Sequence, residues 1–314
     1  MKFFLFLELE SPLEYTIFIF KVFNMFSDTH FHFKMMTEER GIDGPETLKI
    51  MAERNCFFGL DIGTRCDDLQ GRFECVEKSL EKIEDEVLRK RAEKFVYYSA
   101  GIWPDVEEIH DRENCMKKLR QSIQAFPKEK LAAIGEGGLD HHWNPSGADG
   151  RCESDFDQKT YQGERELFEM QLELARELNL PFIIHSRDAF EDTLACVKNI
   201  GYHNGIVHCY SYGIDEARAF LDLGWYIAFG GATTYTKKSK LEEMKALLNF
   251  VPSDRLLLET DSPYLSPVPF RGQVNSPVKI EFVYNHIAQN RGMAVEDLSN
   301  LVDENIRRLF KTVI

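Results

Sequence analysis

The chain has 314 residues, of which 43% are hydrophobic and 29% are charged, and its formal net charge is −14. This composition is that of an ordinary globular protein, and the length suits either two domains or one large α/β barrel. The acidic balance argues against broad, non-specific binding to a polyanion, because such binding rests on a basic surface. It leaves room for a phosphate substrate whose charge is met locally by metal ions.

The first 21 residues are expected to form an N-terminal extension ahead of the main domain. Four charged residues interrupt this Phe- and Leu-rich segment: Glu8, Glu10, Glu14 and Lys21. No apolar run in it approaches the roughly 20 residues of a transmembrane helix. Its apolar start is also too short for a secretory signal, and no small-residue cleavage site follows. We therefore expect residues 22–314 to form the functional domain, without membrane association.

Cysteine usage indicates the compartment. The seven cysteines are Cys56, Cys66, Cys75, Cys115, Cys152, Cys196 and Cys209. Their odd number and the lack of a Cys-x-x-Cys pair favour buried thiols in a reducing environment. The sequence thus predicts a cytoplasmic protein, and it gives no sign of an obligate protein partner.

The first half of the chain alternates apolar runs with polar, helix-forming stretches. Strands are predicted over residues 22–26, 56–62, 95–102 and 131–135. Helices are predicted from the Gly-Pro at 44–45 to about residue 55, within 67–94 and over 105–126. A polar loop is expected over residues 137–159.

The second half repeats the alternation. Strands are predicted over residues 182–184, 205–207, 225–229 and 255–258, and helices over 162–178, 189–199, 215–223, 239–250, 277–290 and 295–310. The strand runs are continuously apolar, which is typical of parallel strands buried on both faces. Eight strands, each followed by helix, predict one (β/α)₈ TIM barrel.

Six side chains that bind metals well stand at the C-terminal ends of these strands. They are His30, His32, Glu136, His185, His208 and Asp261. His30 and His32 are two positions apart, so on a strand they point to the same side. Barrel enzymes build their active sites at this end. Each residue alone could be a core histidine or a helix cap, but the six together predict a divalent-metal site.

The other histidines are weaker candidates. His110, His203 and His286 lie in predicted helices or loops and are interpreted as structural or surface residues. His141 and His142 follow Glu136 closely and could reach the mouth of the site. A ligand set of imidazoles and carboxylates without thiolate suits Mn²⁺, Zn²⁺ or Co²⁺ at least as well as Mg²⁺.

Several segments carry a resemblance to a known family. They are DTHFH at 28–32, GEGGLD at 135–140, LNLPFIIHSRDA at 178–189, VHCYS at 207–211 and LLLETDSPYLSPVPFRGQVNSP at 256–277. Together they resemble the TatD family of metal-dependent deoxyribonucleases over residues 22–314. Two features depart from the family pattern. Trp103 stands where a histidine often precedes Pro104, and both the N-terminal extension and the long 140–160 loop are additions.

The resemblance implies a hydrolytic centre with two or three divalent ions, with Mg²⁺ as a working ion. By similarity, His30, His32 and Asp261 would hold one ion, His185 and His208 would hold another, and Glu136 would bridge them. Paired ions can acidify a shared water and polarise a phosphoryl oxygen. Asp261 is the candidate to accept the proton of that water.

The resemblance also implies a DNA substrate, with single strands trimmed from the 3′ end. Arg187 and Arg271 follow the ligands of strands 5 and 8, and guanidinium groups match phosphate geometry. Ordinary surface ion pairs are the alternative explanation for both arginines.

Two other functions compete with the nuclease. A different amidohydrolase-type barrel would act on a lactone, an amide or a phosphoester, and many such enzymes bridge their ions with a carboxylated lysine from strand 4. Here strand 4 offers Glu136, and the nearest lysine, Lys130, precedes the strand. The second competitor is a non-catalytic metal-binding barrel, which the intact ligand set disfavours.

Overall fold

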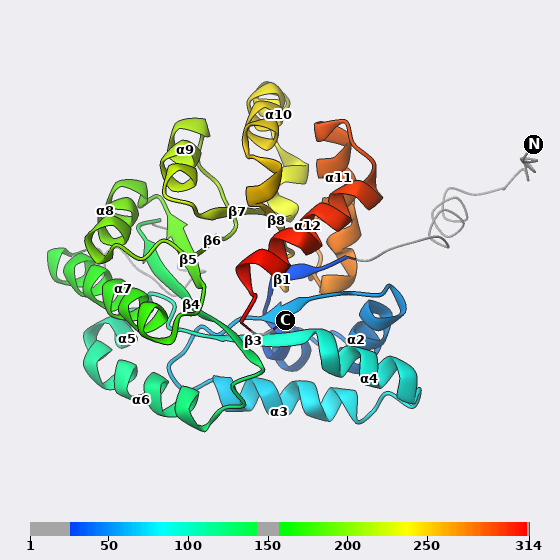
Figure 1. Ribbon diagram of the computed structural model, residues 1–314, viewed down its shortest axis with the longest axis horizontal. Helices are drawn as coiled ribbons and strands as arrows, with labels where there is room; N and C mark the ends of the chain where they lie inside the picture. Colours follow the sequence, from blue (N-terminus) through cyan, green and yellow to red (C-terminus); the bar gives the residue numbers. More distant parts are fainter. Residues whose placement is uncertain (1–25, 143–156, 313) are drawn as a thin grey trace, which may run out of the picture.

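Eight parallel strands pair in chain order. The computed structural model describes residues 26–142, 157–312 and 314. The strands are β1 Asp28–Phe31, β2 Gly59–Asp61, β3 Val96–Ala100, β4 Leu131–Asp140, β5 Phe182–Arg187, β6 Gly205–Val207, β7 Tyr226–Phe229 and β8 Leu256–Leu258. A parallel bridge between Phe31 and Ser262 links β1 to the segment after β8. The sheet is therefore a nearly closed barrel, and the predicted TIM-barrel fold is confirmed (Figure 1).

Helices surround the barrel. They are α2 Gly44–Glu53, α3 Leu69–Leu80, α4 Glu86–Phe95, α5 Val106–His110, α6 Arg112–Ala125, α7 Gln158–Leu178, α8 Phe190–Ile200, α9 Ile214–Asp222, α10 Leu241–Phe250, α11 Ile280–Arg291 and α12 Val295–Leu309. A π-helical turn, Met35–Glu39, follows β1, and short 3₁₀ turns cover Gly231–Tyr235, Lys238–Lys240, Ser253–Arg255 and Pro277–Lys279. Aspartates cap several helix starts; Asp43, for example, accepts the Glu46 N–H before α2.

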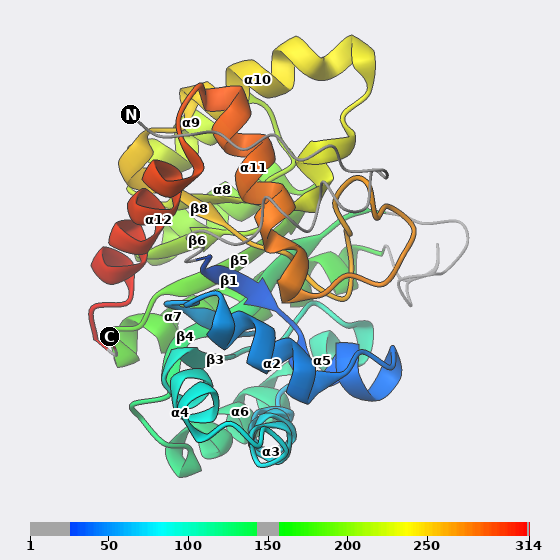
Figure 2. The ribbon, with the colours of Figure 1, turned by 90° about the vertical axis from the view of Figure 1, so that its right-hand side faces the viewer.

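The core explains why the strands read as unbroken apolar runs. All residues of β4, β7 and β8 are buried, because one face of each strand fills the barrel and the other lies under the helices. Figure 2 shows the long segment after β8, in orange, extending from one end of the barrel, while the C-terminus lies at the opposite end. Within the described residues, no helix has the length and apolar character needed to cross a membrane.

The first strand lies later in the chain than predicted. The prediction placed it over 22–26, of which only Phe26 falls within the described residues, and Phe26 precedes the strand. The strand is Asp28–Phe31, so His30 lies within it. A polar start is possible because the buried Asp28 carboxylate accepts hydrogen bonds from the Thr260 N–H and Oγ, at 3.0 and 2.7 Å. The predicted extension, residues 1–21, lies outside the described residues.

The fourth strand is longer than predicted, and it corrects the proposed loop over 137–159. Residues 137–140 continue β4 and pair with β5, which itself extends to Arg187. At the other end, α7 begins at Gln158, where Asp157 accepts the Thr160 N–H at 2.7 Å. The intervening residues 143–156 lie outside the described part of the chain. The helix predicted over 105–126 divides into α5 and α6 at Asp111.

Candidate metal centre

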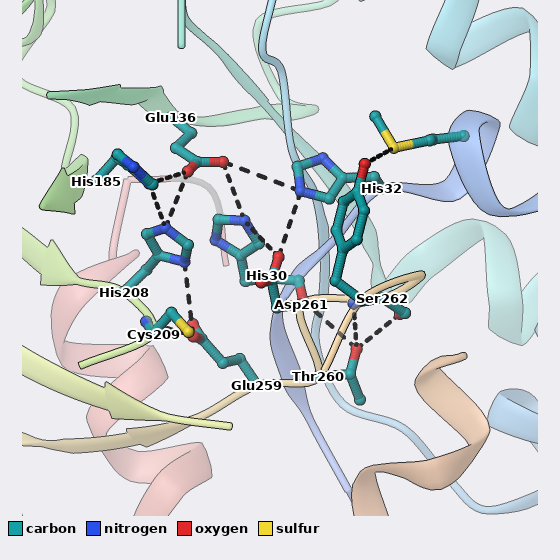
Figure 3. Close-up of polar contacts among 12 residues, drawn as sticks. His30, His32, Glu136, His185, His208, Cys209, Glu259, Thr260, Asp261 and Ser262 are labelled. Carbon is teal, nitrogen blue, oxygen red and sulfur yellow. Dashed lines mark hydrogen bonds and ion pairs between the residues drawn. The ribbon is translucent and has the colours of Figure 1, made fainter. Parts of the chain in front are cut away.

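The barrel brings the six predicted ligands together at one end (Figure 3). His30 comes from β1, Glu136 from β4 and His185 from β5, while the other three directly or closely follow strands: His32, His208 and Asp261. The rings of His30 and His32 are 5.1 Å apart. Because the strands are parallel and neighbouring, residues far apart in sequence reach one small space.

Glu136 stands between two pairs of histidines. Its Oε2 is 3.3 Å from His30 Nε2 and 3.9 Å from His32 Nε2. Its Oε1 is 2.8 Å from His185 Nδ1 and 2.9 Å from His208 Nε2. Each carboxylate oxygen thus faces one imidazole pair, which is the arrangement of a bridging ligand.

Asp261 completes the side of the centre formed by His30 and His32. Its Oδ1 lies 3.6 Å from His30 Nε2 and 3.5 Å from His32 Nε2. The backbone fixes this position, because the Asp261 N–H donates to the His30 carbonyl at 2.8 Å and the His32 N–H donates to the Ser262 carbonyl at the same distance. The segment after β8 is therefore joined to β1 at the ligands themselves.

The condition of His30 fits a metal ligand. Its side chain is fully buried, and neither ring nitrogen makes a hydrogen bond. Burial, together with the charge of His208, lowers the pKa of His30 and keeps the imidazole neutral. A neutral buried imidazole with two unsatisfied nitrogens is costly without a cation and well suited to bind one.

The Glu136 carboxylate and the histidines beside it stabilise one another's charged forms. Burial raises the pKa of Glu136, but the charge of His208 and hydrogen bonds from His185 and His208 outweigh it and hold that pKa well below its usual value. Burial lowers the pKa of His185, yet Asp140 and Glu136 raise it to about 9. Divalent ions would compete with protons on these imidazoles, so metal binding should release protons.

Two carboxylates that were not predicted as site residues stand behind the histidines. Asp140 Oδ2 is 3.0 Å from His185 Nε2, and Glu259 Oε1 is 3.6 Å from His208 Nδ1. Glu259 also belongs to a compact group with His30 and His208 that could hold an ion. In the sequence, Gly137 and Gly138 indicate a loop around Asp140, and Glu259 stands two residues before the predicted ligand Asp261.

Trp103 occupies the position where the family often has histidine. Its ring packs edge-on against the His185 imidazole, with the centroids 5.7 Å apart. An apolar ring therefore borders this ligand in place of a further imidazole.

The two predicted phosphate-binding arginines occupy different places. Arg187 ends β5, is half-buried, and pairs in strand register with Asp140. Arg271 is exposed, and its guanidinium lies over the Tyr235 ring at 4.6 Å from the centroid. Arg187 is thus close to the ligands, whereas Arg271 lies further out on the rim.

The remaining histidines are engaged elsewhere. His141 Nε2 is 3.1 Å from Glu164 Oε2, and His142 Nδ1 is 2.7 Å from Asp188 Oδ2. Neither belongs to a potential ligand group among the described residues. His110 lies on α5 and His286 on α11, as the sequence indicated.

A parallel barrel with histidines and carboxylates gathered at its C-terminal end defines a class of metal-dependent hydrolases. The sequence model of the family described as TatD related DNase matches residues 27–311, so the chain belongs to this family. It is 36% identical over 219 residues to an uncharacterized metal-dependent hydrolase, YabD, of Bacillus subtilis (strain 168), covering 69% of this chain and 78% of the relative.

Two further comparisons agree with this assignment. A 3′-5′ ssDNA/RNA exonuclease TatD of Pantoea vagans (strain C9-1) is 30% identical over 224 residues, covering 69% of this chain and 78% of the relative. The crystal structure of YJJV, a TatD homologue from Escherichia coli K12, superposes with a TM-score of 0.69 at 25% identity, covering 91% of this chain and 98% of that one. The protein is a metal-dependent hydrolase.

Proposed function

We propose that this protein hydrolyses phosphodiester bonds in DNA and removes nucleotides from the 3′ ends of single strands, with two divalent ions as cofactors. The observation that carries the proposal is the division of the Glu136 oxygens between two imidazole pairs. The similarity to a relative named as a 3′-5′ ssDNA/RNA exonuclease supports the choice of substrate.

The residues of the centre divide into two ligand groups. His30, His32 and Asp261 would hold one ion, His185 and His208 would hold the second, and Glu136 would contact both. Paired divalent ions acidify a shared water and polarise a phosphoryl oxygen. The mixed imidazole and carboxylate set is compatible with Mn²⁺ or Zn²⁺ as well as Mg²⁺.

The protein side chains would handle the proton and the substrate charge. Burial raises the pKa of Asp261, but the hydrogen bond from His32 and the charges of the nearby imidazoles outweigh burial and lower that pKa. The side chain is therefore a carboxylate that can accept a proton from water. Arg187 and Arg271 would hold the phosphate oxygens on either side of the scissile bond.

The position of Lys130 disfavours the competing amidohydrolase function. A carboxylated lysine would have to reach the ions from β4, but Lys130 precedes that strand. Its Nζ donates to the backbone carbonyls of Glu93 and Val96 instead, the latter at 3.1 Å. The bridging position is left to Glu136.

The buried thiols of Cys56, Cys75 and Cys196, which form no disulfide, support a reducing, cytoplasmic setting.

The decisive assay uses single-stranded DNA labelled at its 5′ end, with the 3′ end either free or blocked. Stepwise shortening of the free strand alone, abolished by a chelator and restored by Mn²⁺ or Mg²⁺, is the expected result. A simple phosphoester and a lactone are offered in parallel. Hydrolysis of the lactone with intact nucleic acid under every ion would replace the nuclease with the amidohydrolase function.

A variant connects this activity to the centre. Asp261→Asn should keep the fold and lose at least about a hundredfold in turnover, because the amide neither ligates as an anion nor accepts the proton. The matched control is Asp254→Asn, an exposed aspartate just before β8, which should retain full turnover. Equal turnover in the two variants would remove Asp261 from the reaction.

A further inference from the structure

A second cluster of ligand-type side chains lies outside the metal centre. Cys66 follows β2, Glu108 lies on α5 and Cys115 lies on α6. They are 4%, 7% and 4% exposed, and the two sulfurs and one carboxylate oxygen all lie within 4.8 Å of one another. The adjacent helices α5 and α6 thus bring the carboxylate and the second thiol to the loop after β2.

Glu108 carries an unsatisfied buried atom in this cluster. Its Oε1 accepts the Cys66 backbone N–H at 3.1 Å. Its Oε2 is buried without a hydrogen-bond partner. A buried carboxylate oxygen without a hydrogen-bond partner destabilises the folded state unless a positive group satisfies it. A cation could satisfy this oxygen at the point where two thiols also converge.

We propose that Cys66, Glu108 and Cys115 form a binding site for a soft divalent cation of the Zn²⁺ class. Thiolates select such ions over Mg²⁺, and two thiolates with one carboxylate leave a fourth tetrahedral position for water. The site offers thiolate ligands, whereas the catalytic centre offers imidazoles and carboxylates.

Charged side chains of both signs surround the site. Two thiolates and a carboxylate carry three negative charges, so a divalent ion leaves an excess of one. The charges of Arg65 and Asp105 act on Glu108 with opposite signs, and those of Asp111 and Lys118 act on Cys115 in the same opposed way. Burial raises the pKa of both thiols, so binding must displace thiol protons and should strengthen as the pH rises.

The bound ion would brace one wall of the catalytic centre. Thr64, two residues before Cys66, accepts the Trp103 backbone N–H at 2.8 Å. Trp103 in turn packs against His185, and α5 with Glu108 begins shortly after it. An ion at this site would connect the loop after β2, which contacts Trp103 through Thr64, to α5 and α6, which follow Trp103 in the chain.

The test is a Co²⁺ titration of the full chain, stripped of metal and kept reduced. Thiolate-to-cobalt charge transfer gives a near-ultraviolet absorption band that imidazole and carboxylate ligands do not produce. We expect this band to reach the amplitude of one thiolate-bound Co²⁺ per chain in wild type, whatever further Co²⁺ the imidazole centre takes up, and to disappear in Cys66→Ser and in Cys115→Ser. Glu108→Gln should weaken Co²⁺ binding at least about tenfold, by loss of one anionic ligand.

Two controls separate this site from other thiols. Cys75→Ser removes a buried cysteine on α3 outside the cluster, and Cys209→Ser removes the cysteine beside Glu259. Both variants should keep the band. Should the serine variants fail to fold, cadmium NMR of the wild-type protein decides, because a resonance shifted by sulfur ligands is expected. Absence of any thiolate signal in wild type, or its loss only in Cys209→Ser, would overturn the proposal. So would a Cys66–Cys115 disulfide that persists under the reducing conditions of the titration and leaves no thiolate for the metal.

Discussion

Individual residues in the metal centre depend on partners that hold their rings in place. His185 presents Nδ1 to Glu136 and Nε2 to Asp140, so the two carboxylates fix the orientation of the imidazole from opposite sides. His208 lies between Glu136 and Glu259, but its Nδ1 is 3.6 Å from Glu259 Oε1 and makes no hydrogen bond. A carboxylate behind a ligating histidine selects its tautomer and strengthens it as a ligand.

The role of Asp140 leads to a prediction on metal affinity. Asp140→Asn should weaken binding of the ion held by His185 about ten- to a hundredfold, because the amide orients the ring less well and carries no charge. Titration calorimetry with Mn²⁺ measures the change. Asp188→Asn is the matched control, since Asp188 makes a similar contact with His142 away from the ligands. Equal losses in the two variants would contradict a special role for Asp140.

A second residue-scale feature lies far from the centre. Asp303 on α12 is 1% exposed, and its Oδ1 accepts the Ser27 hydroxyl at 2.6 Å. Burial raises the pKa of this carboxyl to about 6, although Ser27 and Arg307 counteract part of the rise. The folded state therefore holds a proton more tightly than the unfolded state, so stability falls as the pH rises from about 4 to about 6.

Asp303→Asn should remove this pH dependence. Between about pH 5 and about pH 7.5, wild type should lose about 1.5 kcal/mol in its free energy of unfolding through this carboxyl, and the variant should not. Any pH-independent effect of the amide cancels in this comparison. Urea denaturation at the two pH values provides the measurement. Asp222→Asn, on the exposed side of α9, should parallel wild type. Parallel curves for Asp303→Asn would show that its carboxyl ionises normally.

At the scale of elements, the order of strands and helices could be predicted because the buried strands other than β1 contain apolar runs. The ligand positions followed from the same pattern, since His185 and His208 come directly after such runs. The strand β4 extends to Asp140, whereas the prediction ended it at residue 135 because its glycines resemble a loop in the sequence. Gly137 and Gly138 indicate a loop in the sequence, but they allow close pairing with β5, where a side chain on Gly138 would meet the His185 carbonyl.

The cysteine cluster could not be predicted from sequence for a different reason. Cys66 and Cys115 have no motif spacing, and they meet only because α5 and α6 pack behind the loop after β2. Such contacts depend on helix packing, which sequence periodicity does not specify. The same limit applies to Asp140, whose contact with His185 requires the register of β4 against β5.

The close approach of β3 and β4 gives a prediction at this scale. A Cβ on Gly101 would lie 2.3 Å from the Gly135 Cα, so Gly101→Ala must push the segment after β3 away from Glu136. We expect a loss of stability of about 1–3 kcal/mol, with reduced metal affinity. Gly71→Ala in α3 is the control, because its nearest neighbour is the flexible end of Lys34 and alanine favours the helix. Unchanged metal affinity in Gly101→Ala would contradict a rigid β3–β4 contact.

At the scale of the whole molecule, the net charge of −14 restricts how a nucleic acid can bind. A protein that covers many phosphates needs a broad basic surface, and the acidic balance opposes one. Attraction must then come from the ions and from a few local cations such as Arg187 and Arg271. The proposed enzyme would therefore hold the end of a strand and leave the rest free, which suits cleavage from an end.

The salt dependence of binding tests this picture. With two arginines on phosphates, the logarithm of the affinity for 3′-blocked single-stranded DNA should fall with the logarithm of salt with a slope of about −1.4, since each contact contributes about −0.7 on single strands. Fluorescence anisotropy at fixed divalent ion supplies the slope. Arg271→Ala should reduce it by about 0.7, whereas Lys90→Ala, on the exposed side of α4, should leave it unchanged. A slope several times steeper in wild type would mean that a long stretch of strand is bound, and the end-holding arrangement would have to be abandoned.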